Sequence, residues 1–416
     1  MSLFRQMRDK LVPALIALAL FLNPLLSWAA GPQCSQIFND SIRDTANGYA
    51  YLGDDIQEHL LSIIDQAKST VDIEMSIEPH QRLMDLLKRK TSEGVRVRAV
   101  IDGRHIKKNS SYRKMWLDTL EELKKMGVDY VISDTDALAK SRRYPGAVLH
   151  RKIIIVDSQF FYVGSANFSK HPNNFEVGYF GPLVKTSRLQ EVFNSDYAAA
   201  KDSWIEQPYK LSENPNIQFN DDSVLMIGPG TKYPDFQDVL VKEIQAAQKK
   251  ILLSIYEATD TKVLKALIAK KEAHPEMDIR VVLCASKMPV WFMHKKLEAD
   301  KNSYFKANLL KAGIDVRIFG GGNQFNHSRF GLFDETIYGS SADFIKRSFE
   351  GSIDLGFLTK DQDLAMWSEH SFDHLWEQSR NVENITLRER LVEGFFMLME
   401  KMTYIFMQIK TLPLPK

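Results

Sequence analysis

The chain contains an internal repeat, and this repeat constrains its fold more than any other feature. Residues 60–102 and 240–284 share one pattern of apolar positions, which predicts a helix, a short β-rich run, a helix and a strand in each copy. A further helix and strand follow each copy, in residues 120–133 and 308–319. Helices that alternate with strands build a sheet covered by helices. We therefore expect an α/β protein with two similar lobes.

A polar motif follows each copy of the repeat. The first, LHRKIIIVDSQFFYVGSANFS (149–169), has the spacing H-x-K-x4-D followed by a serine and an asparagine. The second, FNHSRFGLFDETIYGSSADF (325–344), repeats this spacing with two replacements. The paired positions are His150 and His327, Lys152 and Arg329, Asp157 and Asp334, Ser165 and Ser341, and Asn167 and Asp343. One such histidine is usually a core residue, but a doubled pattern favours function.

Each motif predicts a β-hairpin with its polar residues on one face. Residues two apart on a strand point to the same side, so His150 and Lys152 project together. The turn sequence Asp-Ser-Gln is followed by the strand-like run FFYVG, and the second copy has a turn one residue shorter. The expected facing pairs are Lys152–Ser165, His150–Asn167, Arg329–Ser341 and His327–Asp343.

This set of side chains suits phosphoryl chemistry. A cation and neutral donors that converge on one point stabilise the charge on phosphoryl oxygens in the transition state. Two histidines can divide the work, because a neutral one attacks phosphorus and a protonated one gives a proton to the leaving oxygen. That division requires environments that push their pKa values apart. No metal-ligand cluster is apparent in the sequence, so we expect no metal and no cofactor.

The motifs resemble the phospholipase D superfamily, whose signature is H-x-K-x4-D, then G-S-x-N and a downstream N-x-E. The first copy matches it throughout and ends with Asn174-Phe175-Glu176. The resemblance covers nearly all of the chain to about residue 380. It implies two lobes, each a mixed β-sheet flanked by helices, related by a pseudo-twofold axis with one active site between them.

The resemblance also implies a covalent phosphohistidine intermediate that is resolved by water or an alcohol. His150 would be the nucleophile and His327 the general acid, and Glu176 would orient an imidazole. The predicted catalytic set is His150, Lys152, Asp157, His327, Arg329 and Asp334, of which Asp157 is expected to be chiefly structural. The residues expected to bind or orient phosphate are Ser165, Asn167, Glu176, Ser341 and Asp343.

The second copy departs from the family pattern. Arg329 replaces the lysine, Asp343 the first asparagine, Ser352 the second asparagine and Asp354 the glutamate. Arginine binds phosphate bidentately, where lysine acts as a point charge. A carboxylate repels a phosphodiester, so Asp343 should slow turnover unless it turns away or pairs with Arg329. A weakly active or inactive second lobe is therefore an open alternative.

The first thirty residues predict a secretory signal peptide, with a basic start, an apolar stretch and small residues near Ala29. An uncleaved anchor is the alternative, and we expect a secreted, periplasmic or envelope protein. Without these residues the net charge is near −1, with 51 Lys and Arg against 52 Asp and Glu. Proteins that hold nucleic acid by phosphate charge are usually more basic. Cys34 and Cys284 have no zinc-site spacing, but they could form a disulfide.

The expected organisation has five parts. They are a signal peptide (1–30), a first lobe (31–208), a linker rich in Asn, Pro, Gly and Asp (209–235), a second lobe (236–380) and a helical tail (381–416). The loop 286–296 mixes aromatic residues with lysines, which is typical of a membrane-interface segment, although a buried loop fits equally well. Glu400 and Lys401 interrupt the apolar tail, so it is too broken to span a bilayer.

The substrate requires a separate argument, because the superfamily cleaves both lipids and nucleic acids. Secretion favours a phospholipid membrane surface as the partner, with hydrolysis or transfer of head groups, including cardiolipin-type transfer. A secreted nuclease is the first alternative and a lipid-binding pseudoenzyme is the second. A basic cluster near the first motif suits either substrate and consists of Lys140, Arg142, Arg143 and Arg151. No obligate protein partner is evident, and we expect a monomer.

Overall fold

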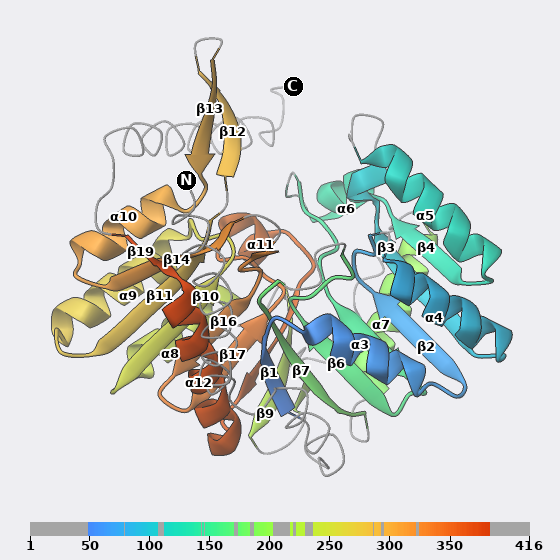
Figure 1. Ribbon diagram of the computed structural model, residues 1–416, viewed down its shortest axis with the longest axis horizontal. Coiled ribbons are helices and arrows are strands. Elements are labelled where there is room, and N and C mark those ends of the chain that lie inside the picture. Colours follow the sequence, from blue (N-terminus) through green and yellow to red (C-terminus); the bar gives the residue numbers. More distant parts are fainter. Residues whose placement is uncertain are drawn as a thin grey trace, which may run out of the picture. The chain divides into compact units, whose positions relative to one another are not determined.

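The computed structural model describes residues 49–382 with internal gaps. The gaps are 79, 107–111, 143, 145, 170–173, 184–186, 203–216, 219–221, 229–235, 286, 293–294 and 322–323. The predicted signal peptide, Cys34 and almost all of the predicted tail lie outside the described residues. Residues 47–416 belong to one unit. Figure 1 shows its two lobes, coloured blue to green and yellow to red.

A seven-stranded mixed sheet lies at the centre of the described part of the first lobe, in the order β1-β7-β6-β5-β2-β3-β4. Strands β2, β3 and β4 are parallel, and the other neighbours are antiparallel. The strands are β1 (Tyr49–Gly53), β2 (Thr70–Glu74), β3 (Arg96–Asp102), β4 (Asp129–Ser133), β5 (Ile153–Val156), β6 (Phe160–Gly164) and β7 (Glu176–Pro182).

The second lobe repeats this order within a larger sheet. Its strands run β15-β14-β11-β10-β16-β17-β18-β9-β8, and β19 also pairs with β14. The stretch from β14 to β9 matches β4-β3-β2-β5-β6-β7-β1, which confirms the two similar lobes. The strands are β8 (Ile217–Gln218), β9 (Ser223–Ile227), β10 (Lys250–Ile255), β11 (Asp278–Cys284), β14 (Asp315–Gly321), β15 (Gln324–Phe325), β16 (Arg329–Phe333), β17 (Thr336–Ser340), β18 (Leu355–Thr359) and β19 (Arg380–Asn381).

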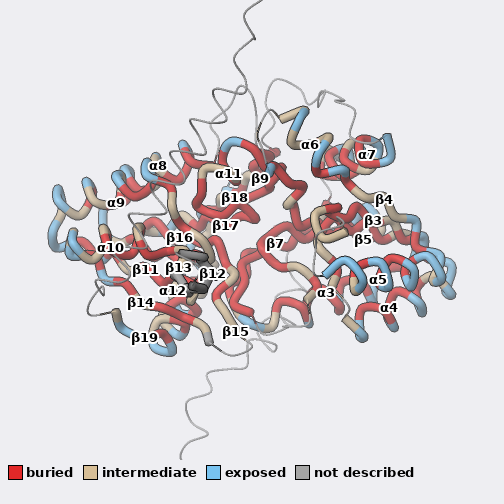
Figure 2. Tube along the Cα trace, turned by 90° about the horizontal axis from the view of Figure 1, so that it is seen from above, coloured by how far each residue is buried: buried red, intermediate tan, exposed pale blue. Residues whose placement is uncertain are grey.

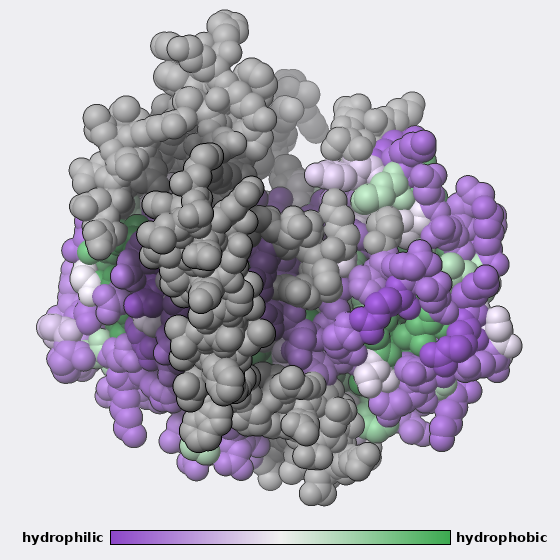
Figure 3. Space-filling model, viewed as in Figure 1, coloured by the Kyte–Doolittle hydropathy of each residue, from purple (hydrophilic) through white to green (hydrophobic). Residues whose placement is uncertain are grey.

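Amphipathic helices cover the sheets. In α4 the buried residues Leu83, Leu86 and Leu87 follow the helical period, and they face the core. Figure 2 shows buried strands beneath helices with one exposed side, and the described residues on the face in Figure 3 are mainly hydrophilic. The helices are α3 (Ile56–Asp65), α4 (Gln81–Ser92), α5 (Arg113–Lys125), α6 (Thr135–Ser141), α7 (Ser187–Lys201), α8 (Phe236–Ala246), α9 (Thr261–Ala273), α10 (Ser303–Lys311), α11 (Lys346–Glu350) and α12 (Gln362–Gln378). Among the described residues, no helix combines the length and apolar character that crossing a bilayer requires.

The two lobes share one hydrophobic core along the seam between their sheets. Strands β6 and β7 contact β17 and β18, and the ring centroids of Tyr179 and Phe357 lie 5.3 Å apart. Apolar residues of both lobes belong to this cluster. Two β-bridges also cross the seam, Leu149–Ile353 and Phe175–Asn326. The segments that lead into the two histidines are therefore held against the opposite lobe.

Both motif hairpins form, but each is shifted by one residue from the expected register. Ile153 pairs with Val163, which places Lys152 opposite Gly164 instead of Ser165. The second hairpin pairs Phe330 with Gly339 and is shifted in the same way. The predicted difference of one residue between the turns is confirmed. The shift arises because the turn aspartates adopt left-handed backbone angles (φ 53° at both Asp157 and Asp334) and leave the ladder.

Two other expectations require correction. The predicted linker 209–235 contains β8 and β9, and β9 pairs with β18 in the second sheet. The segment is rich in Asn, Pro, Gly and Asp, and its composition therefore predicts a linker. The short strand-forming run SVLMI within it was not predicted for that reason. The predicted loop 286–296 is mostly a hairpin of β12 (Lys287–Phe292) and β13 (Lys295–Asp300).

Candidate active site

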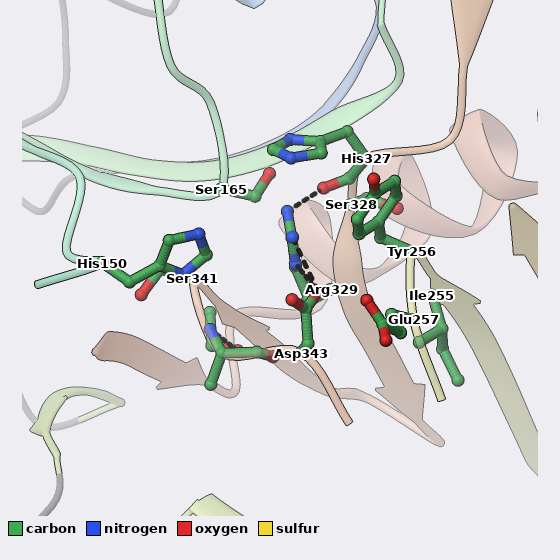
Figure 4. Close-up of polar contacts among 12 residues, drawn as sticks. His150, Ser165, Ile255, Tyr256, Glu257, His327, Ser328, Arg329, Ser341 and Asp343 are labelled. Atoms are coloured by element: carbon green, nitrogen blue, oxygen red, sulfur yellow. Dashed lines mark hydrogen bonds and ion pairs between the residues drawn. The ribbon is translucent and has the colours of Figure 1, made fainter. Parts of the chain in front are cut away.

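The two motif histidines lie on the segments that cross the seam. The His150 amide donates to Ile353 O at 2.8 Å, and the His327 amide donates to Phe175 O at 2.9 Å. Each histidine lies two or three residues before the first strand of its hairpin, and the opposite lobe anchors its backbone. The pseudo-twofold arrangement of the lobes thus brings both imidazoles to one site (Figure 4).

A carboxylate from the opposite lobe holds each imidazole. His150 Nδ1 lies 3.0 Å from Asp354 Oδ1, and His327 Nδ1 lies 2.8 Å from Glu176 Oε1. An ionised carboxylate only accepts, so these contacts place the ring hydrogen on Nδ1 and the lone pair on Nε2. Neither Nε2 makes a hydrogen bond with the described residues. Both rings therefore keep a reactive nitrogen for a substrate.

The motif serines hold these carboxylates. Ser165 Oγ donates to Glu176 Oε2 at 2.5 Å, and Ser341 Oγ donates to Asp354 Oδ1 at 2.7 Å. Both serines are fully buried. Their contacts therefore place them behind the histidines, although the sequence pattern predicts that they bind phosphate. Asn167 is also tied to the protein, since its Oδ1 accepts from the Ser76 amide at 3.2 Å.

The two carboxylates differ in how they use their oxygens. Glu176 gives one oxygen to Ser165 and the other to His327. Asp354 is one methylene shorter and receives both of its contacts on Oδ1, so Oδ2 is buried without a partner. Burial raises the pKa of Asp354, and the Ser341 hydrogen bond opposes that rise. The second-copy replacement of glutamate thus leaves His150 with a less complete support than His327 has.

The motif cations occupy equivalent positions in the two lobes. Lys152 Nζ donates to His150 O at 2.6 Å, and Arg329 Nη1 donates to His327 O at 2.5 Å. Both residues are about 1% exposed. Burial, reinforced by the charge of Arg329, lowers the pKa of Lys152 to about 7. The charge of Lys152 is therefore sensitive to pH near neutrality, whereas Arg329 stays charged.

Asp343 pairs with Arg329, one of the two arrangements that would limit its repulsion of a phosphodiester. Arg329 Nε and Nη2 lie 2.7 and 2.6 Å from Asp343 Oδ1. Burial alone would raise the pKa of Asp343, but the guanidinium outweighs this effect and keeps the pKa below its usual value. The carboxylate therefore stays ionised, and its charge is compensated inside the site.

The surroundings favour the neutral form of His150. Burial lowers its pKa well below the usual value, and the charges of Lys152, Arg104 and Arg329 add to this effect. Burial and Arg329 also lower the pKa of His327, where the Glu176 carboxylate acts in the opposite direction. A neutral imidazole is required for attack on phosphorus. The electrostatics thus suit His150 to the part of nucleophile.

Two further residues border the site and were not predicted from the sequence. Arg104 follows β3, lies 2.5 Å from Asp102 and influences the pKa of both His150 and Lys152. The Tyr256 ring follows β10, with its centroid 4.9 Å from that of His327. Both residues come directly after strands with parallel neighbours. Ligands bind at the carboxyl ends of such strands, so that position was the available signal.

The motif aspartates lie apart from this polar cluster. Asp157 accepts from the amides of Lys68, Ser69 and Thr70 at 2.7–2.8 Å. Asp334 accepts from the amides of Gln248, Lys249 and Lys250 at 2.8–3.0 Å. Each carboxylate ties a hairpin turn to the start of the neighbouring strand. These contacts agree with the structural role expected of Asp157, and they give Asp334, which was predicted as catalytic, the equivalent structural position.

The predicted basic cluster is only partly near the site. Arg151 is buried, pairs with Asp196 and donates from Nε to Asp354 O at 3.2 Å, so it supports the fold behind the site. Lys140 lies in α6, Arg142 follows it, and Arg143 is outside the described residues. Within the part of the chain that the structure describes, no cluster of His, Cys, Asp and Glu could hold a metal ion.

Comparison with known proteins agrees with this geometry. The family described as "Cardiolipin synthase, PLD-like domain" matches residues 60–196 and 240–376, more than half of the chain. A cardiolipin synthase of Alkalihalophilus pseudofirmus is 28% identical over 303 residues, 68% of this chain and 56% of that protein. Cardiolipin synthase A of Pseudomonas fluorescens is 27% identical and covers 83% of this chain and 70% of that protein.

Solved structures agree at the level of the fold. The phosphatidylserine synthase of Haemophilus influenzae has a TM-score of 0.60 at 13% identity, over 87% of this chain and 95% of that one. The chain spans only 56% and 61% of the length of two cardiolipin synthases from Alkalihalophilus pseudofirmus and Halalkalibacterium halodurans. The doubled family match and the paired histidine motifs lead to one conclusion: this chain belongs to the phospholipase D superfamily.

Proposed function

We propose that the protein is a phosphatidyl-transferring enzyme that acts on membrane phospholipids through a covalent phosphohistidine. One observation carries this proposal: two imidazoles from two lobes share a site, and each is held at Nδ1 by the other lobe's carboxylate. That arrangement provides one nucleophile and one proton carrier for a phosphodiester. Relatives that are named cardiolipin synthases favour a phospholipid over a nucleic acid.

In the first step, His150 Nε2 attacks phosphorus and the bond from phosphorus to the head-group oxygen breaks. Protonated His327 gives its proton to that leaving oxygen. Lys152 and Arg329, which lie beside the two histidines, would stabilise the charge that develops on the phosphoryl oxygens in the transition state. Asp354 keeps the His150 hydrogen on Nδ1, and so keeps the attacking lone pair on Nε2.

In the second step, an alcohol or water gives its proton to His327 while its oxygen attacks the same phosphorus. The phosphorus–nitrogen bond breaks, and its electron pair returns to His150. An alcohol yields a new phospholipid, and water yields phosphatidic acid. Glu176 would stabilise the imidazolium form of His327, which is present before the first step and is restored by the second.

The test is an assay of the purified protein on mixed phospholipid vesicles in EDTA with an added alcohol, and on single- and double-stranded DNA in parallel tubes. We expect a phosphatidyl-alcohol together with phosphatidic acid, and no cleavage of DNA. His150→Ala should reduce lipid turnover at least a thousandfold, because the covalent route is lost. His327→Ala should also slow lipid turnover, because it lacks the acid of the first step and the base of the second. Mass spectrometry of peptides from the wild type during turnover should detect a phosphatidyl group on His150.

The outcomes separate the alternatives. Cut DNA with intact lipid would replace the proposal with a nuclease. Lipid turnover that survives in His150→Ala would remove the phosphohistidine mechanism. Vesicle binding without turnover would indicate a lipid-binding pseudoenzyme, and the altered second motif would then be the first place to look.

A further inference from the structure

The second motif leaves one carboxylate oxygen available at the centre of the site. Arg329 Nε and Nη2 both contact Oδ1 of the Asp343 side chain. Asp343 Oδ2 accepts no hydrogen bond from the described residues, and unlike Asp354 Oδ2 it is not shut away from solvent. None of the described residues donates to this oxygen, so its hydrogen-bond donors are water and, when one is bound, a ligand.

The equivalent residue of the first lobe, Asn167, has no carboxylate oxygen to offer to a ligand. Asn167 Oδ1 accepts from the Ser76 amide, which ties that side chain to the strand β2 region. The two copies therefore differ in what they offer to a substrate, and not only in charge. Asp343 also lies within electrostatic reach of both His150 and His327, which places it where the reacting groups meet.

The second-lobe side of the site is close to electrically neutral. Arg329 offsets Asp343, and Lys301 Nζ pairs with Glu257 Oε2 at 3.1 Å. The Tyr256 ring lies between these pairs, 5.0 Å from the Arg329 guanidinium and 5.8 Å from Lys301 Nζ. Because each carboxylate already has a cation, a neutral hydrogen-bond donor fits Asp343 Oδ2 better than an ammonium group does.

We propose that Asp343 Oδ2 accepts a hydrogen bond from a second hydroxyl of the acceptor alcohol, so that the site selects polyols. This inference rests on the proposed phosphatidyl transfer. One hydroxyl oxygen attacks the phosphorus bound to His150 and gives its proton to His327, while the phosphorus–nitrogen bond breaks. A neighbouring hydroxyl donates to Asp343 and orients the alcohol. An alcohol with a single hydroxyl cannot make both contacts at once.

The experiment compares acceptors in competition within one tube. Vesicles of mixed phospholipids receive the enzyme with equal amounts of deuterated glycerol, 1-propanol and ethanolamine, and mass spectrometry measures each phosphatidyl product and phosphatidic acid. We expect glycerol to be preferred by the wild type. Asp343→Asn keeps Oδ1 for Arg329 but puts an NH2 donor in place of Oδ2, so the glycerol-to-propanol ratio should fall roughly tenfold.

Two variants serve as controls for this experiment. Arg329→Lys combined with Asp343→Asn recreates the residue pair of the first motif without a buried uncompensated guanidinium, and it should lose the preference equally. Asn167→Asp adds a carboxylate in the first lobe and should leave the ratio unchanged. Both variants should show the cooperative unfolding of the wild type.

Each other result overturns the inference. An unchanged ratio in both Asp343 variants would remove the role of Oδ2 while leaving the proposed function intact. Preferred use of ethanolamine would mean that the carboxylate binds an ammonium group. If the wild type formed no phosphatidyl product, including phosphatidic acid, the proposed function itself would fail and this inference with it.

Discussion

At the scale of single residues, Lys152 should control the pH dependence of substrate capture. Burial and Arg329 lower its pKa to about 7, so the free enzyme loses this positive charge as the pH rises through that value. Loss of the charge weakens phosphate binding, and kcat/KM should therefore fall above about pH 7. Lys152→Arg keeps the charge, since arginine does not deprotonate in proteins, and should move this decline to higher pH.

The control is Lys270→Arg, which changes a buried lysine in α9 whose Nζ donates to Ala247 O at 2.9 Å. Its pH profile should match that of the wild type. If Lys152→Arg keeps a decline near pH 7, a different group governs the alkaline limb.

The residue types of the site could be predicted from the sequence, but their contacts could not. The spacing identified both histidines and both cations as candidates, and the family resemblance added Glu176. Pairing of Asp343 with Arg329 was one of the predicted arrangements. The assignment of Ser165 to phosphate does not match its contact with Glu176. A hydroxyl suits either partner chemically, so only three-dimensional placement distinguishes them.

At the scale of elements, the motif aspartates should contribute to stability. Asp157→Ala removes the acceptor for three backbone amides at the start of β2, and should lower the free energy of unfolding by about 1–3 kcal/mol at pH 7. Partial burial raises the pKa of Asp157, but the amide hydrogen bonds outweigh this effect and leave the pKa below its usual value. Its stabilisation is therefore complete above the unfolded pKa near 4 and disappears as the pH falls through the folded pKa.

Denaturant unfolding at pH 7 and in acid measures this effect, and Asp334→Ala provides the matched change in the second lobe. The difference between each variant and the wild type should shrink in acid. A large loss of kcat with unchanged stability would instead restore these aspartates to the catalytic set.

Element order was predictable because helix and strand periods repeat along the chain, whereas strand register was not. Both hairpins are shifted by one residue because Asp157 and Asp334 leave the ladder at left-handed angles. Alternating patterns do not specify the backbone angles of a turn. Strand β9 was missed because five apolar-rich residues within a polar segment carry a weak signal.

At the scale of the whole molecule, the seam should make the two lobes unfold together. Phe357 of β18 is 1% exposed and packs against Tyr179 of β7 in the core shared by both lobes. Phe357→Ala should destabilise the protein by about 3–5 kcal/mol and leave a single calorimetric transition. Phe344→Ala, in a cluster confined to the second lobe, is the matched change and should also give one transition. Two separate transitions in either variant would show that the lobes are independent.

The sequence does not predict that each histidine is held by a carboxylate of the other lobe. His150 and Asp354 are 204 positions apart, and His327 and Glu176 are 151 apart. Each carboxylate lies near its own motif along the chain, and nothing in that spacing reveals which histidine it supports. Because the packed lobes are related by a pseudo-twofold axis, each carboxylate lies beside the histidine of the other lobe.

This exchange has a consequence for how such a protein can diverge. In a dimer of identical single-motif chains, any mutation would alter both halves of the site at once, and the two histidines would remain equivalent. Joining the copies in one polypeptide removes that restriction. Here one copy retains Lys152 and Asn167 while the other carries the mutually dependent Arg329 and Asp343. Covalent fusion thus lets natural selection assign the donor and the acceptor of a reaction to separate, independently mutable halves.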